Sequence, residues 1–124
     1  MTQNGALGEQ FAAEYLKKQG YRILQTNFNT RFGEIDIIAQ KGDILAFVEV
    51  KTRAASMLAT PAEAVTPAKQ KKLIKATLQY LQTHPNDLQP RFDVISIITE
   101  SKSGFAVMDI MHLTDAFEAT TQQF

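Results

Sequence analysis

Apolar residues recur at helical spacing in two segments of the chain. The first segment predicts a helix over Ala6–Lys18, with Gly20 just past its end, where a left-handed turn is common. Its apolar stripe comprises Leu7, Phe11, Ala12, Tyr15 and Leu16. The second segment predicts a longer helix from Pro67 to about Gln82, because Thr66 suits the N-cap and proline suits the first helical position.

Short apolar runs, alternating or continuous, predict five strands around these helices. The strands are expected at Tyr21–Thr26, Glu34–Gln40, Ile44–Lys51, Phe92–Ile98 and Phe105–Met111. Residues Ala54–Val65 are small, rich in alanine and interrupted by Pro61, which indicates a loop or a weak helix. Thr114–Ala119 is expected to form a short terminal helix.

The predicted elements follow the order α-β-β-β-α-β-β-α, without repeats, low-complexity tracts or an interior linker. The long helix connects the third and fourth strands, and such a passage favours a parallel pair with a crossover. A chain of 124 residues suits one domain with one core. We therefore expect a single α/β domain over residues 1–124, with a mixed sheet and helices packed on its faces.

Charged residues interrupt the apolar pattern in the stretch GEIDIIAQKGDILAFVEVKTR, residues 33–53, which otherwise indicates a β-hairpin. Side chains alternate between the two faces of a strand. In the second arm Ile44, Ala46, Val48 and Val50 share one face, and Leu45, Phe47, Glu49, Lys51 and Arg53 share the other. In the first arm one face carries Ile35, Ile37 and Ala39, and the other face carries Glu34, Asp36 and Ile38. One face of the hairpin is therefore apolar, and the other becomes charged away from the turn.

The turn of this hairpin decides how closely its carboxylates approach. With a two-residue turn at positions 42–43, Asp36 lies directly opposite Glu49, where Cβ atoms are about 4.5–5.5 Å apart. With the turn at positions 41–42, Asp36 is diagonal to Glu49. Either register leaves Asp36, Glu49 and Lys51 on one face of the sheet.

Asp36 and Glu49 carry carboxylates that repel each other unless a cation bridges them or one is protonated. The apolar residues on the same face must be covered, so both acids are expected at the edge of a covered surface. Mg²⁺ or Mn²⁺ prefers oxygen ligands and would supply positive charge. Lys51 can then hold a phosphate oxygen or orient a water, an arrangement suited to metal-assisted phosphodiester hydrolysis. Glu34 is instead expected to be solvated and paired with Lys51.

Composition narrows the possible chemistry. The chain has no cysteine, which excludes a thiolate nucleophile, a disulfide framework and a cysteine-based zinc site. Its two histidines, His84 and His112, are far apart in sequence, which argues against a histidine-rich metal site. We favour structural roles for His112 and for Asp93. No stretch has the length and apolarity of a membrane span and no secretory signal is visible, so we expect a cytoplasmic protein without membrane contact.

Positive charge is concentrated in the middle of a chain whose formal net charge is zero. Residues 50–86 contain six basic residues and one acid. The candidates for contacts with nucleic-acid phosphates are Arg53, Lys69, Lys71, Lys72 and Lys75. Taken alone, the same run is better explained as a solvated helix face.

Several short motifs together resemble a known family. They are Gly8-Glu9, Gly33-Glu34-Ile35-Asp36, Phe47-Val48-Glu49-Val50-Lys51, Arg91-Phe92-Asp93-Val94, and His112-Leu113 with Ala116-Phe117. The set is similar to the bacterial YraN-type family of the PD-(D/E)XK nuclease superfamily, which includes restriction endonucleases and archaeal Holliday junction resolvases. The resemblance implies a restriction endonuclease-like αβββαβ core in three layers around a mixed central sheet. It also implies that Asp36, Glu49 and Glu9 bind metal and that Lys51 is catalytic.

Two functions from different classes follow as hypotheses. The first is a Mg²⁺- or Mn²⁺-dependent endonuclease that hydrolyses phosphodiester bonds, with branched or structured DNA as the expected substrate. The second is a module of the same fold that binds nucleic acid within a larger assembly without cutting it. The set of Asp, Glu and Lys favours the enzyme over this module and over a protein-interaction domain. DNA is favoured over RNA as the partner, and the choice between monomer and homodimer stays open.

Overall fold

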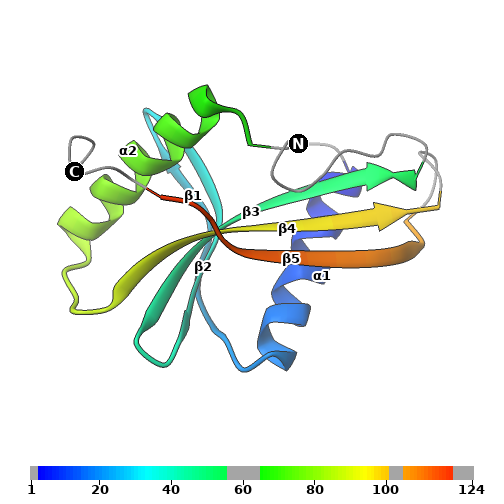
Figure 1. Ribbon diagram of the computed structural model, residues 1–124, viewed down its shortest axis with the longest axis horizontal. Coiled ribbons are helices and arrows are strands. Elements are labelled where there is room, and N and C mark those ends of the chain that lie inside the picture. Colours follow the sequence, from blue (N-terminus) through cyan, green and yellow to red (C-terminus); the bar gives the residue numbers. More distant parts are fainter. Residues whose placement is uncertain (1–2, 56–64, 101–104, 119–124) are drawn as a thin grey trace.

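Figure 1 shows the fold as a computed structural model, which describes residues 3–55, 65–100 and 105–118. Its elements are α1 (Gln3–Lys18), β1 (Arg22–Thr30), β2 (Gly33–Lys41), β3 (Ile44–Ala54), α2 (Pro67–Thr83), β4 (Gln89–Thr99) and β5 (Val107–Phe117). Their order confirms the predicted αβββαβ core, which one further strand follows.

The strands of the described chain form one mixed sheet in the order β1-β2-β3-β4-β5. Strands β1, β2 and β3 pair antiparallel, as short connections allow. Strands β3 and β4 pair in parallel, because the crossover through α2 returns the chain to the end of the sheet at which β3 begins. Strand β5 then pairs antiparallel with β4 at one edge. The predicted mixed sheet and its parallel crossover are therefore confirmed.

Each face of the sheet is covered by one helix, which gives three layers (Figure 1). The buried core on the α1 face comprises Ala12, Leu16, Tyr21, Ile37, Ala39, Ala46, Val48, Ile95 and Ile97. The buried core on the α2 face comprises Ile35, Ile38, Leu45, Phe47, Val65, Leu73, Ile74, Ala76, Tyr80, Phe92 and Val94. Each large apolar side chain stabilises the layers by roughly 1.5–3 kcal/mol when fully buried. The predicted three-layer arrangement is confirmed.

The start of α2 is set by its capping residue. The hydroxyl of Thr66 accepts a hydrogen bond from the backbone N–H of Lys69 at 3.3 Å, and Pro67 begins the helix, as predicted. The cap sets the rotation of the first turn of α2 and therefore the position of Lys69 relative to the sheet.

The two helices have lengths suited to covering a sheet. Helix α1 has 16 residues and α2 has 17. Within the ranges that the structure describes, no helix is both long enough and apolar enough to cross a membrane.

The predicted short helix at Thr114–Ala119 is wrong as far as the structure describes it. The chain continues β5 to Phe117, which pairs with Phe92 of β4 and stacks on its ring with centroids 4.7 Å apart. Asp115 has a φ of 53°, which interrupts regular pairing without ending the strand. Pairing with β4 and aromatic stacking therefore outweigh the local helical pattern.

The predicted loop or weak helix over Ala54–Val65 lies mostly outside the described residues. Ala54 is the last residue of β3, and Val65 is buried against the α2 core. Residues 56–64 are not described, so this prediction stays a prediction.

Strand β2 departs from the predicted alternation of faces at Asp36. Ile37 and Ala39 belong to the α1 core, as expected, but Ile35 belongs to the α2 core together with Ile38. The prediction that Ile35 shares a face with Ile37 is therefore wrong. Pairing between β2 and β3 also ends at Ile37. At Asp36 the strand separates from β3 while it stays paired with β1, a local irregularity of the kind that re-aims a side chain.

Candidate metal centre

The turn of the hairpin sets the register of β2 and β3. Lys41 pairs with Ile44 across a two-residue turn in which Gly42 has a positive φ of 59°. Of the two predicted registers, this is the one that places Asp36 opposite Glu49 when continued along the strands.

The side chain of Asp36 substitutes for a backbone partner at the point where the strands separate. The last residue pair between β2 and β3 is Ile37 with Val48. Beyond it, Asp36 Oδ2 accepts a hydrogen bond from the backbone N–H of Val50 at 2.8 Å. This bond holds the Asp36 carboxylate in the opening between the two strands.

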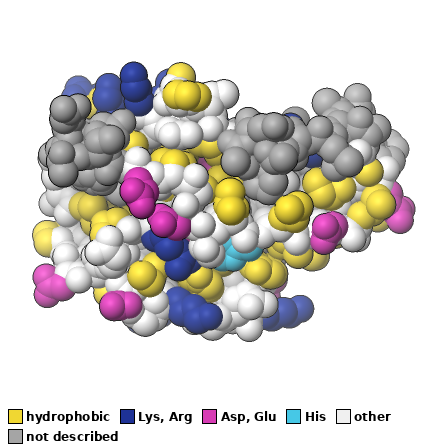
Figure 2. Space-filling view, viewed as in Figure 1, with side chains coloured by type: hydrophobic (Ala, Val, Ile, Leu, Met, Phe, Trp, Pro, Cys, Tyr) yellow, Lys and Arg dark blue, Asp and Glu magenta, His cyan; other side chains and the backbone are white. Residues whose placement is uncertain are grey.

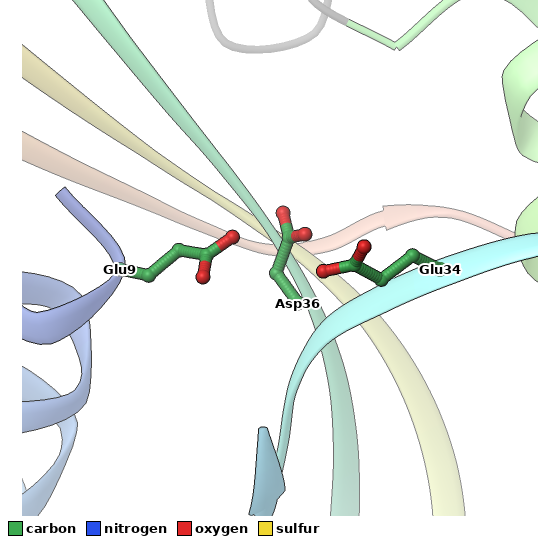
Figure 3. A group of neighbouring side chains, drawn as sticks. All are labelled: Glu9, Glu34 and Asp36. Atoms are coloured by element: carbon green, nitrogen blue, oxygen red, sulfur yellow. The ribbon is translucent and has the colours of Figure 1, made fainter. Parts of the chain in front are cut away.

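Three carboxylates converge at this opening (Figure 3). Glu9 comes from α1, and Glu34 and Asp36 come from β2. One oxygen of each lies within 4.8 Å of the others, a spacing that allows one cation to contact all three. All three side chains are partly exposed, so ions from solvent can reach them. We call these three residues the acidic cluster.

Asn27 on β1 holds two members of the acidic cluster. Its side-chain amide donates to Glu9 Oε2 at 2.9 Å and to Glu34 Oε1 at 2.6 Å. Asn27 has a φ of 52°, in the left-handed region that asparagine tolerates better than most residues. The amide thus links α1 to β2 and reduces the repulsion between the two acids.

Gly8 allows α1 to approach the sheet closely enough for Glu9 to reach the acidic cluster. A Cβ atom at position 8 would overlap the side-chain oxygen of Thr52 on β3. Helix α1 therefore packs against β3 through bare backbone at this point. Glu9 is the next residue and is carried toward β2 by this contact.

Burial and the negative charge of Glu49 raise the pKa of Asp36 from 3.8 to about 8. Glu9 and Glu34 raise it further by smaller amounts, against the hydrogen bond from Val50, which lowers it. Without a cation, the Asp36 carboxyl is therefore largely protonated at neutral pH. A cation among these groups favours the ionised form, so metal binding is coupled to proton release.

Glu49 lies on the α2 side of the site with two lysines around it. Its side chain is only 4% exposed. The Nζ of Lys69 lies 2.5 Å from Glu49 Oε1, and the Nζ of Lys51 lies 3.5 Å from the same oxygen. A buried carboxylate stays ionised only with partners of this kind. The charge of Glu49 is therefore compensated by the protein itself. We call Glu49, Lys51 and Lys69 the lysine half of the site.

The two lysines respond differently to this environment. Burial lowers the pKa of Lys51, and its hydrogen bond with Lys69 lowers it further. Burial also lowers the pKa of Lys69, but the hydrogen bond and the charge of Glu49 outweigh burial, and the net change is upward. Lys69 is therefore the principal counter-ion of Glu49.

The expectation that Glu34 is solvated and paired with Lys51 is wrong. Glu34 belongs to the acidic cluster, and the ion pair of Lys51 is with Glu49. Asp36 and Glu9 lie together in the cluster, whereas Glu49 adjoins it and contributes to the raised pKa of Asp36.

Glu34 and Asn27 were not predicted as residues of the site, for different reasons. Glu34 carried a usable signal, because alternation puts it on the same strand face as Asp36. Asn27 carried none, because its position depends on the register between β1 and β2 and on a positive φ.

Lysines of α2 lead away from the site along one side of the helix. Lys69, Lys72 and Lys75 are spaced three residues apart, so each is a surface neighbour of the next. Lys69 and Lys72 line a groove of about 290 Å³ together with Gly33 and Glu34. This groove runs from the acidic cluster onto the helix.

At the far end of this row two cations lie near one aromatic ring. The Arg31 guanidinium carbon lies 4.8 Å and the Lys75 Nζ lies 5.6 Å from the centroid of the Phe32 ring. Lys71 is exposed, and Arg53 is half-buried on β3. Figure 2 shows Lys and Arg side chains along the upper edge, where Figure 1 draws α2. Contact of these residues with nucleic acid stays a prediction.

Asp93 belongs to a separate buried network on the α1 side. Arg91 donates to both of its carboxylate oxygens, at 2.8 and 2.7 Å, and to the hydroxyl of Tyr21. His112 Nε2 lies 2.8 Å from Asp93 Oδ2, and the N–H of Asp115 donates to Oδ1 at 3.1 Å. Burial alone would raise the pKa of Asp93, but these hydrogen bonds outweigh it and lower it. The arrangement agrees with structural roles for Asp93 and His112.

The donors of the acidic cluster fit a hard divalent cation. Carboxylate oxygens at this spacing are the ligands that Mg²⁺ and Mn²⁺ prefer. When all groups are ionised, the cluster and the lysine half together hold four carboxylates and two ammonium groups. The site then has two negative charges more than it has positive charges, and one divalent cation would offset them.

The known proteins that this chain resembles in sequence belong to one family. Residues 8–97 match the model described as "Uncharacterised protein family UPF0102". The chain is 49% identical over 118 residues to a UPF0102 protein of Chlorobium phaeobacteroides, with 93% of each chain covered. It is 48% identical over 122 residues to one of Syntrophus aciditrophicus, covering 95% of this chain and 93% of the relative. A UPF0102 protein from Syntrophomonas wolfei is 45% identical over 114 residues, and the match covers 91% of this chain and 96% of the relative.

Proposed function

The chain belongs to the UPF0102 family, the YraN-like family that its motifs resemble, and from its site we propose that it is a divalent-metal-dependent endonuclease acting on DNA. The observation that carries the proposal is the convergence of Glu9, Glu34 and Asp36 within 4.8 Å. Beside it lies the pair of Glu49 and Lys51. The five-stranded mixed sheet agrees with a restriction endonuclease-like core.

The acidic cluster would hold the metal, with Glu49 next to it. Bound Mg²⁺ or Mn²⁺ would supply positive charge that polarises the phosphodiester and activates water for attack. Burial of Asp36 and Glu49 places their charges where electrostatic attraction is stronger than in water. Asn27 and the backbone N–H of Val50 keep the carboxylates oriented before any cation arrives.

Lys51 is the residue that we assign to the reacting phosphate. It projects from β3 two positions after Glu49, and its side chain is 29% exposed, which leaves it accessible to substrate. A cation held at this position stabilises negative charge that develops on the phosphate oxygens in the transition state. Its lowered pKa also suits a group that gives up a proton more readily than an ordinary lysine.

The path of the nucleic acid is proposed to follow α2. Lys72 and Lys75 continue from the groove beside Glu34 toward Arg31 and Phe32. Successive cations at this spacing can neutralise successive phosphates of one strand, and an aromatic ring can stack with a base. A strand splayed away from a duplex would use both features, which is why branched or structured DNA is the proposed substrate.

The second candidate is a non-cleaving module that binds nucleic acid. The pairing of Glu49 with Lys69 favours it, because the buried carboxylate has a counter-ion without any metal. Such a protein would bind branched DNA through the same lysines and would show no metal-dependent cleavage.

The experiment that separates the two candidates is a cleavage and binding assay on one substrate panel. End-labelled four-way junction, flap, duplex and single-stranded DNA are incubated with purified protein in Mn²⁺, Mg²⁺ or EDTA. We expect cleavage of at least one branched substrate in Mn²⁺ or Mg²⁺ and none in EDTA. Binding of the junction without cleavage would instead favour the non-cleaving module.

Matched variants assign any cleavage to this site. Asp36→Asn and Lys51→Ala should each slow it by about 10²–10³-fold, whereas replacing Asp109, an exposed acid on β5, by Asn should leave it unchanged. Cleavage that persists at the parental rate in both site variants would contradict the proposal.

A further inference from the structure

Lys69 has the shortest contact to Glu49, although it comes from a different element. Its Nζ lies 2.5 Å from Glu49 Oε1, whereas Lys51, on the same strand as Glu49, lies 3.5 Å from that oxygen. Glu49 is 4% exposed and Lys69 is 37% exposed. A buried carboxylate is thus held by an ammonium that reaches in from the helix and remains accessible to solvent.

The Lys69 ammonium lies against Glu49 Oε1, and Glu49 adjoins the acidic cluster. Asp36 accepts a hydrogen bond from the backbone N–H of Val50, the residue after Glu49, and Glu34 lines one groove together with Lys69, so the acidic cluster lies next to the pair of Glu49 and Lys69. A divalent cation bound among the acids would therefore approach Glu49 as well. Two positive groups at one carboxylate oxygen repel each other, so the metal and Lys69 oppose each other there.

We propose that Lys69 is a built-in counter-ion that holds Glu49 in the metal-free protein and releases it when a divalent cation binds. This inference rests on the proposed function for the location of the metal. It goes beyond that function by giving Lys69 a role in metal binding, in place of the simple phosphate contact that the charge pattern suggested.

The structure provides a place for the released ammonium. Lys69 is in the first turn of α2, where the Thr66 cap holds its backbone N–H, and its four-carbon stem carries the ammonium away from this fixed point. Lys69 already lines the groove that contains Lys72, Gly33 and Glu34. Movement into this groove needs only side-chain rotation and would add a cation to the row on α2.

The first test measures metal affinity without nucleic acid. Mn²⁺ is titrated calorimetrically into the parent protein and into Lys69→Met, which keeps an unbranched stem of similar length but carries no charge. We expect Lys69→Met to bind Mn²⁺ more tightly by on the order of tenfold, as for release of one hydrogen bond to a charged group. Lys18→Met, which replaces an exposed lysine in the last turn of α1, is the control and should bind Mn²⁺ as the parent does.

The second test follows the lysine itself in the unsubstituted protein. Acylation of Lys69 by a limiting amine-reactive reagent is quantified by mass spectrometry with and without Ca²⁺, and exposed Lys71 serves as the internal reference. We expect Ca²⁺ to increase labelling of Lys69 several-fold and to leave Lys71 unchanged. In Glu49→Gln, labelling of Lys69 should already be high and should not respond to Ca²⁺.

The outcomes separate this inference from the proposed function. Weaker or unchanged Mn²⁺ affinity in Lys69→Met, or labelling of Lys69 that ignores Ca²⁺ while Ca²⁺ binds, would overturn the counter-ion role. Tighter Mn²⁺ binding in Lys69→Met together with no cleavage of any DNA would leave this inference standing and contradict the nuclease. If neither metal binds the parent protein or Lys69→Met, both proposals fail.

Discussion

At the scale of single residues, Asp36 couples the stability of the metal-free protein to pH. A carboxyl group whose pKa is higher in the folded protein binds more protons there than in the unfolded chain. Its contribution to stability is then complete below the unfolded value and is lost as pH rises through the folded value. For Asp36 that window runs from 3.8 to about 8.

Replacing Asp36 by Asn should remove this dependence. In EDTA, we expect the free energy of unfolding of the parent to fall across the window by more than that of Asp36→Asn, because the amide has no charge to bury. Urea denaturation at pH values near both ends of the window provides the measurement, and Asp109→Asn controls for loss of an exposed acid. Parallel pH profiles for the parent and Asp36→Asn would refute the assignment.

Lys51 is also considered as a single residue, and its expected effect is on turnover. Lys51→Ala removes a cation beside the phosphate, so we expect turnover to fall by about 10²–10³-fold with little change in DNA affinity or melting temperature. Single-turnover cleavage in Mn²⁺ and binding in Ca²⁺ separate the two effects, with Lys71→Ala as the control. Because Asp36 and Lys51 act as one unit, Asp36→Asn/Lys51→Ala should be little slower than either single variant. Fully multiplicative losses would argue against a shared site.

At the scale of elements, the position of Glu9 depends on how closely α1 packs on β3. Gly8→Val should push α1 outward, because a Cβ at position 8 already meets the Thr52 side chain and lies 3.8 Å from Ile97 Cδ1. We expect a destabilisation of about 1–3 kcal/mol, typical of overpacking. Mn²⁺ affinity should fall as well, since Glu9 moves away from Asp36.

The matched control for this change is Glu9→Gln, which removes the ligand without moving the helix. It should lose Mn²⁺ affinity while keeping the parental unfolding midpoint in EDTA. Parental Mn²⁺ affinity in Gly8→Val would show that Glu9 is not held in place by this contact.

Helix α2 is expected to contribute to DNA binding through its row of lysines. Changing Lys72 and Lys75 to Ala should reduce the slope of log affinity against log salt concentration by about two, because each neutralised phosphate of duplex DNA contributes about 0.9. Fluorescence anisotropy with a labelled junction in Ca²⁺ over a salt series gives the slope. Lys71→Ala should change it less, and an equal effect from Lys71 would place the nucleic acid elsewhere on the helix.

At the scale of the whole molecule, Asp93 ties separate parts of the sheet together. Its side chain has no exposed surface and is bonded to Arg91 on the same strand and to His112 on β5. Through Arg91, the network reaches Tyr21, the residue before β1. The network is distinct from the acidic cluster, so it should affect stability without affecting metal binding.

Asp93→Asn should therefore destabilise the protein by about 3–5 kcal/mol, because it leaves the Arg91 charge without its carboxylate. Urea denaturation measures the loss, and Mn²⁺ titration of the folded variant should give the parental affinity. Arg22→Gln, an exposed cation on β1, serves as the control with little expected change. Full stability in Asp93→Asn would contradict the structural role.

The sequence by itself determined most of the architecture. Helical spacing at Ala6–Lys18, the cap and proline at Thr66-Pro67 and the turn at Gly42 are local signals, and each produced the element it predicts. The same local reading was wrong at Thr114–Ala119, where pairing with β4 and stacking on Phe92 decided the conformation.

The sequence also predicted Asp36, Glu49 and Lys51 as one group, from alternation and a two-residue turn, which relate neighbouring strands. Only the tertiary structure decided that Glu34 joins the acidic cluster, that Asn27 holds it, and that Lys69 is the partner of Glu49. These contacts join β1, α1 and α2 to the hairpin. Their formation depends on register, on the separation of β2 from β3 at Asp36 and on the packing of both helices. These features are set by burial of the whole core and not by any local run of residues.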